Sequence, residues 1–296
     1  MGAPEVPAYV LHAQEPSEIP VLIAAPHGGR SYPPQLLREL RHGDSAALRL
    51  EDRYVDLLAQ AVARGTGAHL LLARAPRAMI DLNRAPEDID WDMFRRQDRP
   101  DGPLPAPSRR ARSGLGLIPR RLPGTGELWR RRLSARELAD RLDGIHRPYH
   151  EALGQTLADI RKRWGAALLI DLHSMPPLPA TGGTMKTEVV LGDRFGASCH
   201  GSMAAAAFAG LARAGRGAAH NRPYAGGYVL DRHADPREGV HALQIEVDRS
   251  CYLDSNLIEP GPGMDRMVRD LSDLVCGLAA LAADLGQDKS WPMAAE

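Results

Sequence analysis

Short apolar runs alternate with longer amphipathic stretches along this chain, and this alternation is the feature that most constrains its fold. The short runs are read as buried strands and the longer stretches as helices. The strands are expected at 21–25, 69–73, 78–82, 167–170, 187–191 and 240–247. Strands that alternate with helices are typical of a mostly parallel sheet covered by helices on both faces. The sequence therefore predicts an α/β fold.

The helices are predicted from the spacing of apolar residues and from end signals. One helix is expected at 48–64, with Gly65 able to end it. Another begins after the capping-box pattern of Ser134 and Glu137 and bends near Pro148. Two further helices are expected at 202–214 and 265–285.

Residues 85–133 differ from the rest of the chain. They are rich in Pro, Arg, Gly and Asp and show little periodicity. The stretch is too long for an ordinary loop, so we expect a partly ordered excursion near a site. Because the chain shows no internal repeat and no clear linker, we predict a single domain over 1–296.

The composition argues against several classes of protein. Lys+Arg and Asp+Glu both number 37 in the 296 residues, and a neutral chain has no net attraction for nucleic acid or for an anionic membrane. Three cysteines without C-x-x-C spacing argue against a disulfide framework or a thiolate zinc site. We find no signal-peptide pattern and no apolar run of the ~18 residues that a membrane span needs. A cytoplasmic protein is expected.

Polar residues gather directly after the predicted strands. They are His27 after the first strand, Asn83 and Arg84 after the third, Asp171 and His173 after the fourth, and Glu246 late in the last. In open α/β sheets, ligand sites form beyond the carboxyl ends of the strands. We therefore expect these residues at one edge of the sheet, where a catalytic or binding site would lie.

The two histidines are candidate metal ligands. His27 lies between Pro26 and a Gly-Gly pair that allows a sharp turn and close approach of another group. If the strand predicted at 167–170 continues through His173, this histidine shares a strand face with Asp171, which could orient a metal-bound imidazole as an outer-shell partner. The alternatives are a surface-loop histidine for His27 and a histidine bonded to a carbonyl for His173.

A carboxylate from Glu51 or Asp52 could complete the ligand set. Both are on the predicted helix at 48–64, and either could face inward from its spacing to Val55. Two histidines and one carboxylate with an open position form a catalytic zinc pattern. The alternative is an acidic pair at a solvated helix start, which the helix dipole favours.

Glu246 and Arg84 are candidate catalytic residues. A glutamate within a buried strand is costly unless it is paired or functional, and Glu246 could act as general base toward a metal-bound water. A structural salt bridge with Arg84 or Arg249 is the alternative. The guanidinium of Arg84 suits a substrate carboxylate or a developing oxyanion, although a solvated arginine is the simpler interpretation.

A tight turn with polar groups spans 221–228 and is either a substrate-binding loop or a simple connection. Other motifs are absent from the sequence: there is no G-x-S-x-G elbow, Walker loop, H-E-x-x-H or G-x-G-x-x-G. Serine hydrolase, kinase and dehydrogenase functions lose support accordingly.

The order of these motifs resembles that of the N-formylglutamate amidohydrolase family. The resemblance runs from about Val21 to the C-terminal helix. Its landmarks are Pro26-His-Gly-Gly29 with Tyr32-Pro33, Asp52-Arg-Tyr-Val-Asp56, Ile80-Asp-Leu-Asn-Arg84, Gly116-Leu-Ile-Pro119, Arg147-Pro-Tyr-His150, Asp171-Leu-His-Ser174, 221–227, and 238–246 with Tyr252-Leu-Asp254. One departure is that Gly28 stands where the family commonly has Ser.

This resemblance implies a three-layer α/β/α fold with a mixed, mostly parallel central sheet, like that of the zinc carboxypeptidases. It implies one divalent metal, zinc above all, on His27, Asp52 and His173, with Glu51 as the substitute for Asp52. Glu246 becomes the general base, and Arg84 the contact to an oxyanion or carboxylate. The candidates for holding the substrate are Arg84, Asn221, Arg222, Gly226 and Gly227.

The implied reaction is hydrolysis of N-formyl-L-glutamate to formate and L-glutamate, as in histidine degradation. Its partner would be a small N-acyl amino acid. One alternative is a metal-dependent amidase or peptidase acting on another N-acyl amino acid or a cell-wall peptide. A non-catalytic binding protein on the same scaffold is the second, and His27, His173 and Glu246 argue against it.

Overall fold

The structure is a computed structural model that describes residues 7–102, 106, 108–122, 124, 126–179 and 186–287. By their contacts the residues form two compact units. The first consists of Met1–Val10, Pro26–Glu51 and Ala73–Glu151. The second consists of Leu11–Ala25, Asp52–Leu72 and Ala152–Glu296. The expectation of a single domain remains a prediction.

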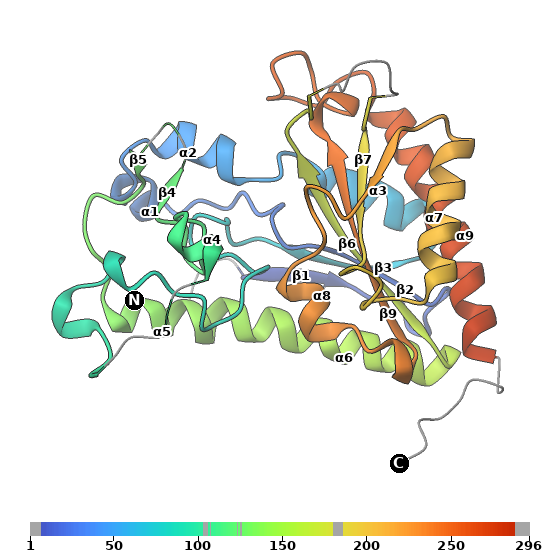
Figure 1. Ribbon diagram of the computed structural model, residues 1–296, viewed down its shortest axis with the longest axis horizontal. Helices are drawn as coiled ribbons and strands as arrows, with labels where there is room; N and C mark the ends of the chain where they lie inside the picture. The colour runs from blue at the N-terminus through green and yellow to red at the C-terminus, as the bar shows by residue number, and fades with distance from the viewer. Residues whose placement is uncertain are drawn as a thin grey trace. The chain divides into compact units, whose positions relative to one another are not determined.

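A seven-stranded sheet forms the centre of the fold, in the order β1-β3-β2-β6-β9-β7-β8 (Figure 1). The strands are β1 Tyr9–His12, β2 Val21–Ala25, β3 His69–Ala73, β6 Ala167–Met175, β7 Val189–Gly192, β8 Ala218–His220 and β9 Val240–Asp248. The β2–β3, β2–β6, β6–β9 and β7–β8 pairs are parallel, and β7 runs antiparallel to β9. The predicted mixed, mostly parallel sheet is confirmed.

One face of the sheet carries the main apolar core. Because side chains alternate along a strand, Ile23, Ile170 and Ile245 all point to this face. They pack under three helices, α3 Val55–Thr66, α7 Gly201–Arg213 and α9 Met264–Gln287. Figure 1 shows α3 in blue and α9 in red. Strands β2 and β6 are buried along their whole length, and this burial explains why their sequences are mostly continuous apolar runs.

The opposite face holds polar residues. Asp171 and His173 of β6 pair with Gln244 and Glu246 of β9, which places all four on one face. Helix α8, Tyr228–His233, packs against β9, and Gly154 of α6 (Arg147–Trp164) lies against His233. Helices therefore lie on both faces, and the predicted three-layer α/β fold is confirmed.

Short elements dominate the first unit. The helices are α1 Pro34–Glu39, α2 Gly43–Leu50, α4 Arg109–Arg112 and α5 Ala135–Arg141, with a small sheet of β4 Arg121–Leu122 and β5 Gly126–Glu127. The 3-10 turns are Trp91–Met93 and Arg96–Asp98, and in the second unit Pro236–Glu238 and Arg249–Cys251. The described part of 85–133 contains short elements and buries the side chains of Phe94 and Trp129, and its expected place near a site remains a prediction.

The capping box of Ser134 and Glu137 is present and begins α5. A π-helical turn, Leu142–His146, lies directly before α6, and the predicted bend near Pro148 remains a prediction. The strands at 21–25 and 69–73 have the predicted bounds, whereas β6 runs on through His173 to Met175. None of the helices in the described residues is long and apolar enough to span a membrane.

Two predicted elements are wrong. Residues 78–82 form no strand: Ala78, Ile80 and Leu82 are buried in a run of turns, and the alternation reflects that burial. The helix expected at 48–64 is interrupted, because α2 ends at Leu50 and α3 begins only at Val55. The second helix also ends later than expected, at Thr66, where Gly67 rather than Gly65 adopts the left-handed conformation.

Candidate functional site

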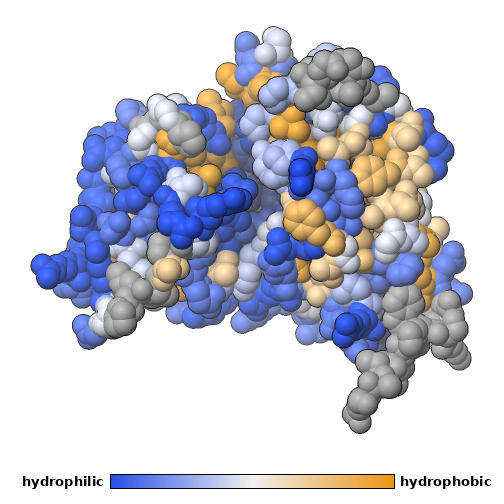
Figure 2. All heavy atoms as spheres, viewed as in Figure 1, coloured by the Kyte–Doolittle hydropathy of each residue, from blue (hydrophilic) through white to orange (hydrophobic). Residues whose placement is uncertain are grey.

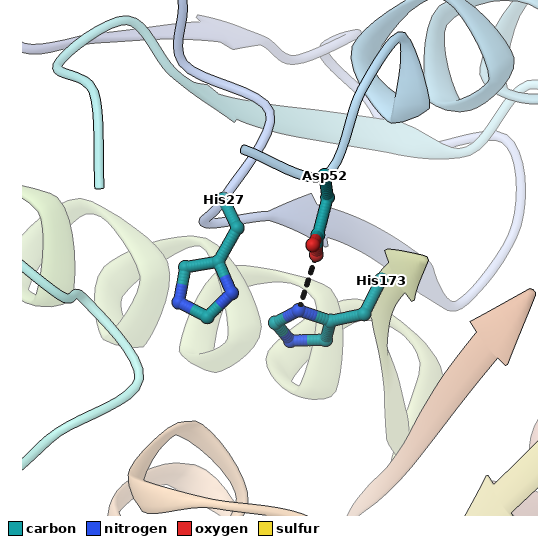
Figure 3. Close-up of side chains that lie close together, drawn as sticks. All are labelled: His27, Asp52 and His173. Carbon is teal, nitrogen blue, oxygen red and sulfur yellow. Dashed lines mark hydrogen bonds and ion pairs between the residues drawn. The ribbon is translucent and has the colours of Figure 1, made fainter. Parts of the chain in front are cut away.

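Three predicted metal ligands come together in the structure. His27, Asp52 and His173 are all buried, and one potential ligand atom from each lies within 4.8 Å of the others (Figure 3). In the sheet β2 pairs with β6 so that Ala24 lies opposite Asp171, and His27 follows the end of β2 by two residues. Asp52 lies in the connection between α2 and α3.

Both ring nitrogens of His173 face carboxylates. Nδ1 lies 2.9 Å from Asp52 Oδ2, and Nε2 lies 2.9 Å from Asp171 Oδ2. Burial lowers the pKa of this imidazole, but the charges and hydrogen bonds of Asp171 and Asp52 outweigh it and raise the pKa well above its usual value. The surroundings of His173 therefore favour a positive charge at this point.

His27 is held in the same manner by a different carboxylate. Its Nε2 lies 2.7 Å from Oδ1 of Asp81, which is fully buried and also receives Arg77 at 2.9 Å and the backbone N–H of Asn83 at 2.8 Å. Burial raises the pKa of Asp81, but the positive charges of Arg77 and His27 outweigh it and hold the pKa well below its usual range. Asp81 thus stays ionised and can accept a hydrogen bond from the Nε2–H of His27.

The two histidines therefore share one arrangement. Each bonds a buried aspartate through Nε2, so that Nδ1 is the nitrogen placed toward the cluster, and Figure 3 shows a ring nitrogen of His27 directed toward Asp52 and His173. A carboxylate behind each imidazole is the usual support of a metal-ligating histidine. Two imidazoles and one carboxylate also form a donor set suited to a catalytic divalent metal. The residues present fit such an ion.

The carboxylate in this group is Asp52 rather than Glu51. Both are buried, at 4% and 2% exposure, so the alternative of a solvated acidic pair is wrong. Neither lies on a helix, because both belong to the connection after α2. Oδ1 of Asp52 also lies 3.4 Å from Nη2 of Arg249.

Glu246 lies beside His173 in the β6–β9 pairing and on the same polar face. It is 7% exposed, and its negative charge contributes to the raised pKa of His173. The side-chain N–H of Gln244 donates to its Oε1 at 2.9 Å. Arg249, one suggested salt-bridge partner of Glu246, contacts Asp52 and donates from Nε to Ser174 Oγ at 3.1 Å.

Arg84 is partly buried, so the alternative of a solvated arginine is wrong. It donates to the carbonyl oxygens of Leu115 at 3.1 Å and Asn83 at 2.7 Å. Burial lowers its pKa, with the charge of Asp81 acting in the opposite direction. A half-buried guanidinium beside the aspartate that holds His27 is compatible with a role in binding, which remains a prediction.

The turn at 221–227 has a clear structural role. Asn221 is left-handed with φ 58°, and its side-chain amide donates to Asp193 Oδ1 at 2.8 Å and accepts from Asp193 N at 3.0 Å. Gly226 has φ 101°, where a side chain would be strained, and Gly227 precedes α8. Arg222 is exposed. Substrate contacts by Asn221, Arg222, Gly226 and Gly227 remain predictions.

Sequence reasoning missed two residues beside the cluster. Asp81 belongs to the motif that was used only for Arg84, and its place after an apolar stretch, two residues before Asn83, was the available signal. Arg249 was considered only as a partner of Glu246. Its contact with Asp52 depends on how the connection after α2 meets the end of β9, which no local pattern reveals.

Comparisons with known proteins reveal a family relationship. The family model described as N-formylglutamate amidohydrolase matches residues 19–253. Proteins named N-formylglutamate deformylase from Pseudomonas aeruginosa and Pseudomonas putida are each 31% identical, over 241 and 244 residues. These matches cover 80% of this chain and 83% and 82% of the relatives.

Solved structures show the same relationship. The crystal structure of N-formylglutamate amidohydrolase from Ralstonia eutropha JMP134 is 31% identical with a TM-score of 0.82, covering 94% of this chain and 99% of that one. A gene product from Agrobacterium tumefaciens shares the fold at 17% identity and a TM-score of 0.63, covering 95% and 96% of the two chains. With the family model spanning most of the sequence, the chain belongs to the N-formylglutamate amidohydrolase family.

Proposed function

We propose that this protein hydrolyses the amide bond of N-formyl-L-glutamate to formate and L-glutamate. The observation that carries the proposal is the buried group of His27, Asp52 and His173 beside Glu246. The relatives named N-formylglutamate deformylase, at 31% identity over four fifths of the chain, support the substrate.

His27, Asp52 and His173 would hold one divalent metal, with zinc favoured by the two imidazoles and the carboxylate. When bound, such a metal lowers the pKa of a coordinated water toward neutrality and polarises a substrate carbonyl. Asp81 and Asp171 would accept a hydrogen bond from the Nε2–H of each imidazole, which orients the ring and leaves Nδ1 for the metal. This is the arrangement that supports metal binding.

Glu246 acts as the general base in this proposal. Its carboxylate takes a proton from the attacking water, whose oxygen bonds to the formyl carbon. The same carboxylate then returns the proton to the glutamate nitrogen as the carbon–nitrogen bond breaks. The hydrogen bond from Gln244 to Oε1 orients the carboxylate for both transfers. Formate and L-glutamate leave as the two products.

Arginines would bind the anionic parts of the substrate. N-formyl-L-glutamate carries two carboxylates, and guanidinium groups bind carboxylates through paired hydrogen bonds. Arg84 is proposed to contact a carboxylate or the developing oxyanion. Arg222 and the turn with Asn221, Gly226 and Gly227 are proposed to hold a substrate carboxylate.

The test combines turnover with metal analysis. Glu246→Gln should lower kcat by about 10²–10⁴-fold while keeping its metal, since general base catalysis contributes about that much. His27→Ala should lose metal as well as turnover. The matched controls are Glu238→Gln and His42→Ala, both at exposed positions. Wild-type turnover by Glu246→Gln would disprove the base, and full metal in His27→Ala would disprove the ligand.

The substrate is tested with a panel of N-acyl amino acids and cell-wall peptides. The proposal predicts the highest kcat/KM for N-formyl-L-glutamate. If other acyl compounds or peptides are turned over and the formyl compound is not, the proposed substrate is wrong and the alternative amidase function is correct.

A further inference from the structure

The two carboxylate oxygens of Asp52 have different neighbours. Oδ2 lies 2.9 Å from Nδ1 of His173, on the side of the candidate metal ligands. Oδ1 lies 3.4 Å from Nη2 of Arg249. The carboxylate is thus placed between a ligand histidine and a guanidinium, with one oxygen directed to each.

Arg249 also holds the strand that carries His173. Its Nε donates to Ser174 Oγ at 3.1 Å, and Ser174 directly follows His173 on β6. The side chain of Arg249 is only 12% exposed, so both contacts are made largely away from water. A single guanidinium therefore joins the end of β6 to the connection that carries Asp52.

This connection has little regular structure to fix it. Asp52 lies between α2 and α3, where the helical hydrogen-bond pattern is interrupted. A second contact comes from the same end of β9, because the hydroxyl of buried Tyr252 donates to the backbone oxygen of Arg53 at 2.7 Å. The side chains that follow β9 therefore hold both the backbone and the carboxylate of this segment.

We propose that Arg249 is a positioning residue that makes Asp52 a one-oxygen metal ligand. This inference rests on the metal site of the proposed function. With Oδ1 engaged by the guanidinium, only Oδ2 is presented to the metal, and coordination positions stay open for water and substrate. Without Arg249 the carboxylate can rotate and bind through both oxygens or turn away.

A simple salt bridge between chain segments would have a different effect. It would change the stability of the fold and leave the metal geometry as it is. Ligand positioning instead changes metal affinity and coordination number, and both are measurable without turnover.

The experiment compares wild type with Arg249→Gln and Arg249→Lys. Arg266→Gln is the matched control, because Arg266 is an exposed arginine of α9 paired with Asp270. Zn²⁺ affinity is measured by competition with a chromogenic chelator, and the Co²⁺ form is examined by visible absorption. Far-UV circular dichroism and Tm verify the fold of each variant.

We expect Arg249→Gln to bind Zn²⁺ about 10–100-fold more weakly, the usual effect of removing a group that supports a metal ligand. The Co²⁺ band should lose intensity as Asp52 binds through both oxygens. Arg249→Lys keeps the charge but cannot make both contacts, so its Zn²⁺ affinity should lie between those of wild type and Arg249→Gln. If Arg249→Gln does not fold, Arg249→Lys provides the same comparison.

Wild-type Zn²⁺ affinity and an unchanged Co²⁺ spectrum in a folded Arg249 variant would overturn the inference and leave the proposed function standing. A wild-type protein that binds no Zn²⁺ or Co²⁺ would overturn both the metal site and the inference. A lower Tm with normal metal binding would assign Arg249 a purely structural role and likewise overturn the inference.

Discussion

Asp81→Asn is the substitution that best separates the support of His27 from its role as a ligand. The carboxylate of Asp81 bonds His27 Nε2 at 2.7 Å, Arg77 at 2.9 Å and the N–H of Asn83 at 2.8 Å. An amide has nearly the same shape but lacks the charge. Its NH₂ group must face one of these donors, so His27 or Arg77 loses its acceptor.

The expected magnitudes follow from these contacts. Loss of the carboxylate behind a ligand histidine should weaken Zn²⁺ binding about 10–100-fold. That range corresponds to about 1.4–2.7 kcal/mol of binding free energy. Hydrogen bonds to charged groups contribute about 1.5–3 kcal/mol each, so the free energy of unfolding of the metal-free protein should fall by a similar amount.

Zn²⁺ affinity is measured by chelator competition and stability by urea unfolding. Asp92→Asn serves as the control, because this aspartate is 70% exposed and makes only a long contact to Arg99 at 3.6 Å among the ion pairs of the described residues. Wild-type Zn²⁺ affinity in Asp81→Asn would refute the role assigned to the carboxylate. A loss of stability no larger than that of the control would refute the energetic reasoning.

Two further predictions concern the scaffold. Gly29→Ala should lower Tm, because an added Cβ would meet the backbone oxygen of Ala75. In Gly277→Ala the added Cβ meets nothing within 4 Å, and because Gly277 lies in α9 the substitution should stabilise the fold by about 0.5–1 kcal/mol. Equal Tm values for the two variants would contradict this. Burial raises the pKa of Glu137, but hydrogen bonds from Arg131 and Ser134 outweigh it and lower the pKa to about 2. The stability that this glutamate adds should therefore be present above its unfolded pKa of about 4.3 and be lost as the pH falls toward 2. Urea unfolding across this range should show a weaker pH dependence in Glu137→Gln, and an unchanged dependence would be evidence against the assignment.

The strands β2, β3, β6, β7 and β9 were predictable because they are almost entirely buried, whereas the partly exposed β1 and β8 were not predicted. Apolar runs such as 21–25 and 69–73 are typical of strands buried on both faces, and their predicted bounds were correct. The alternation of polar and apolar residues in β9 also placed Glu246 on the face opposite the core. The local pattern of apolar residues was sufficient to predict a strand wherever burial in the sheet determines which residues are apolar.

The pattern failed where contacts distant in sequence decide the conformation. The predicted helix at 48–64 breaks where Tyr54 adopts φ 55°, and its hydroxyl donates to Glu259 at 2.7 Å. Residues 78–82 alternate like a strand, yet the N–H of Asp81 bonds the carbonyl of Leu117 in an irregular segment. The same limit explains why the contact of Arg249 with Asp52 was missed.

We propose that His27, Asp52 and His173 hold a divalent metal needed for hydrolysis of N-formyl-L-glutamate. The most direct measurement is metal content together with turnover, for the protein as purified, after chelation and after addition of Zn²⁺. We expect one metal ion per chain, loss of turnover when the metal is removed and recovery of turnover when it is added back. Full turnover of N-formyl-L-glutamate by the metal-free protein would contradict this proposal.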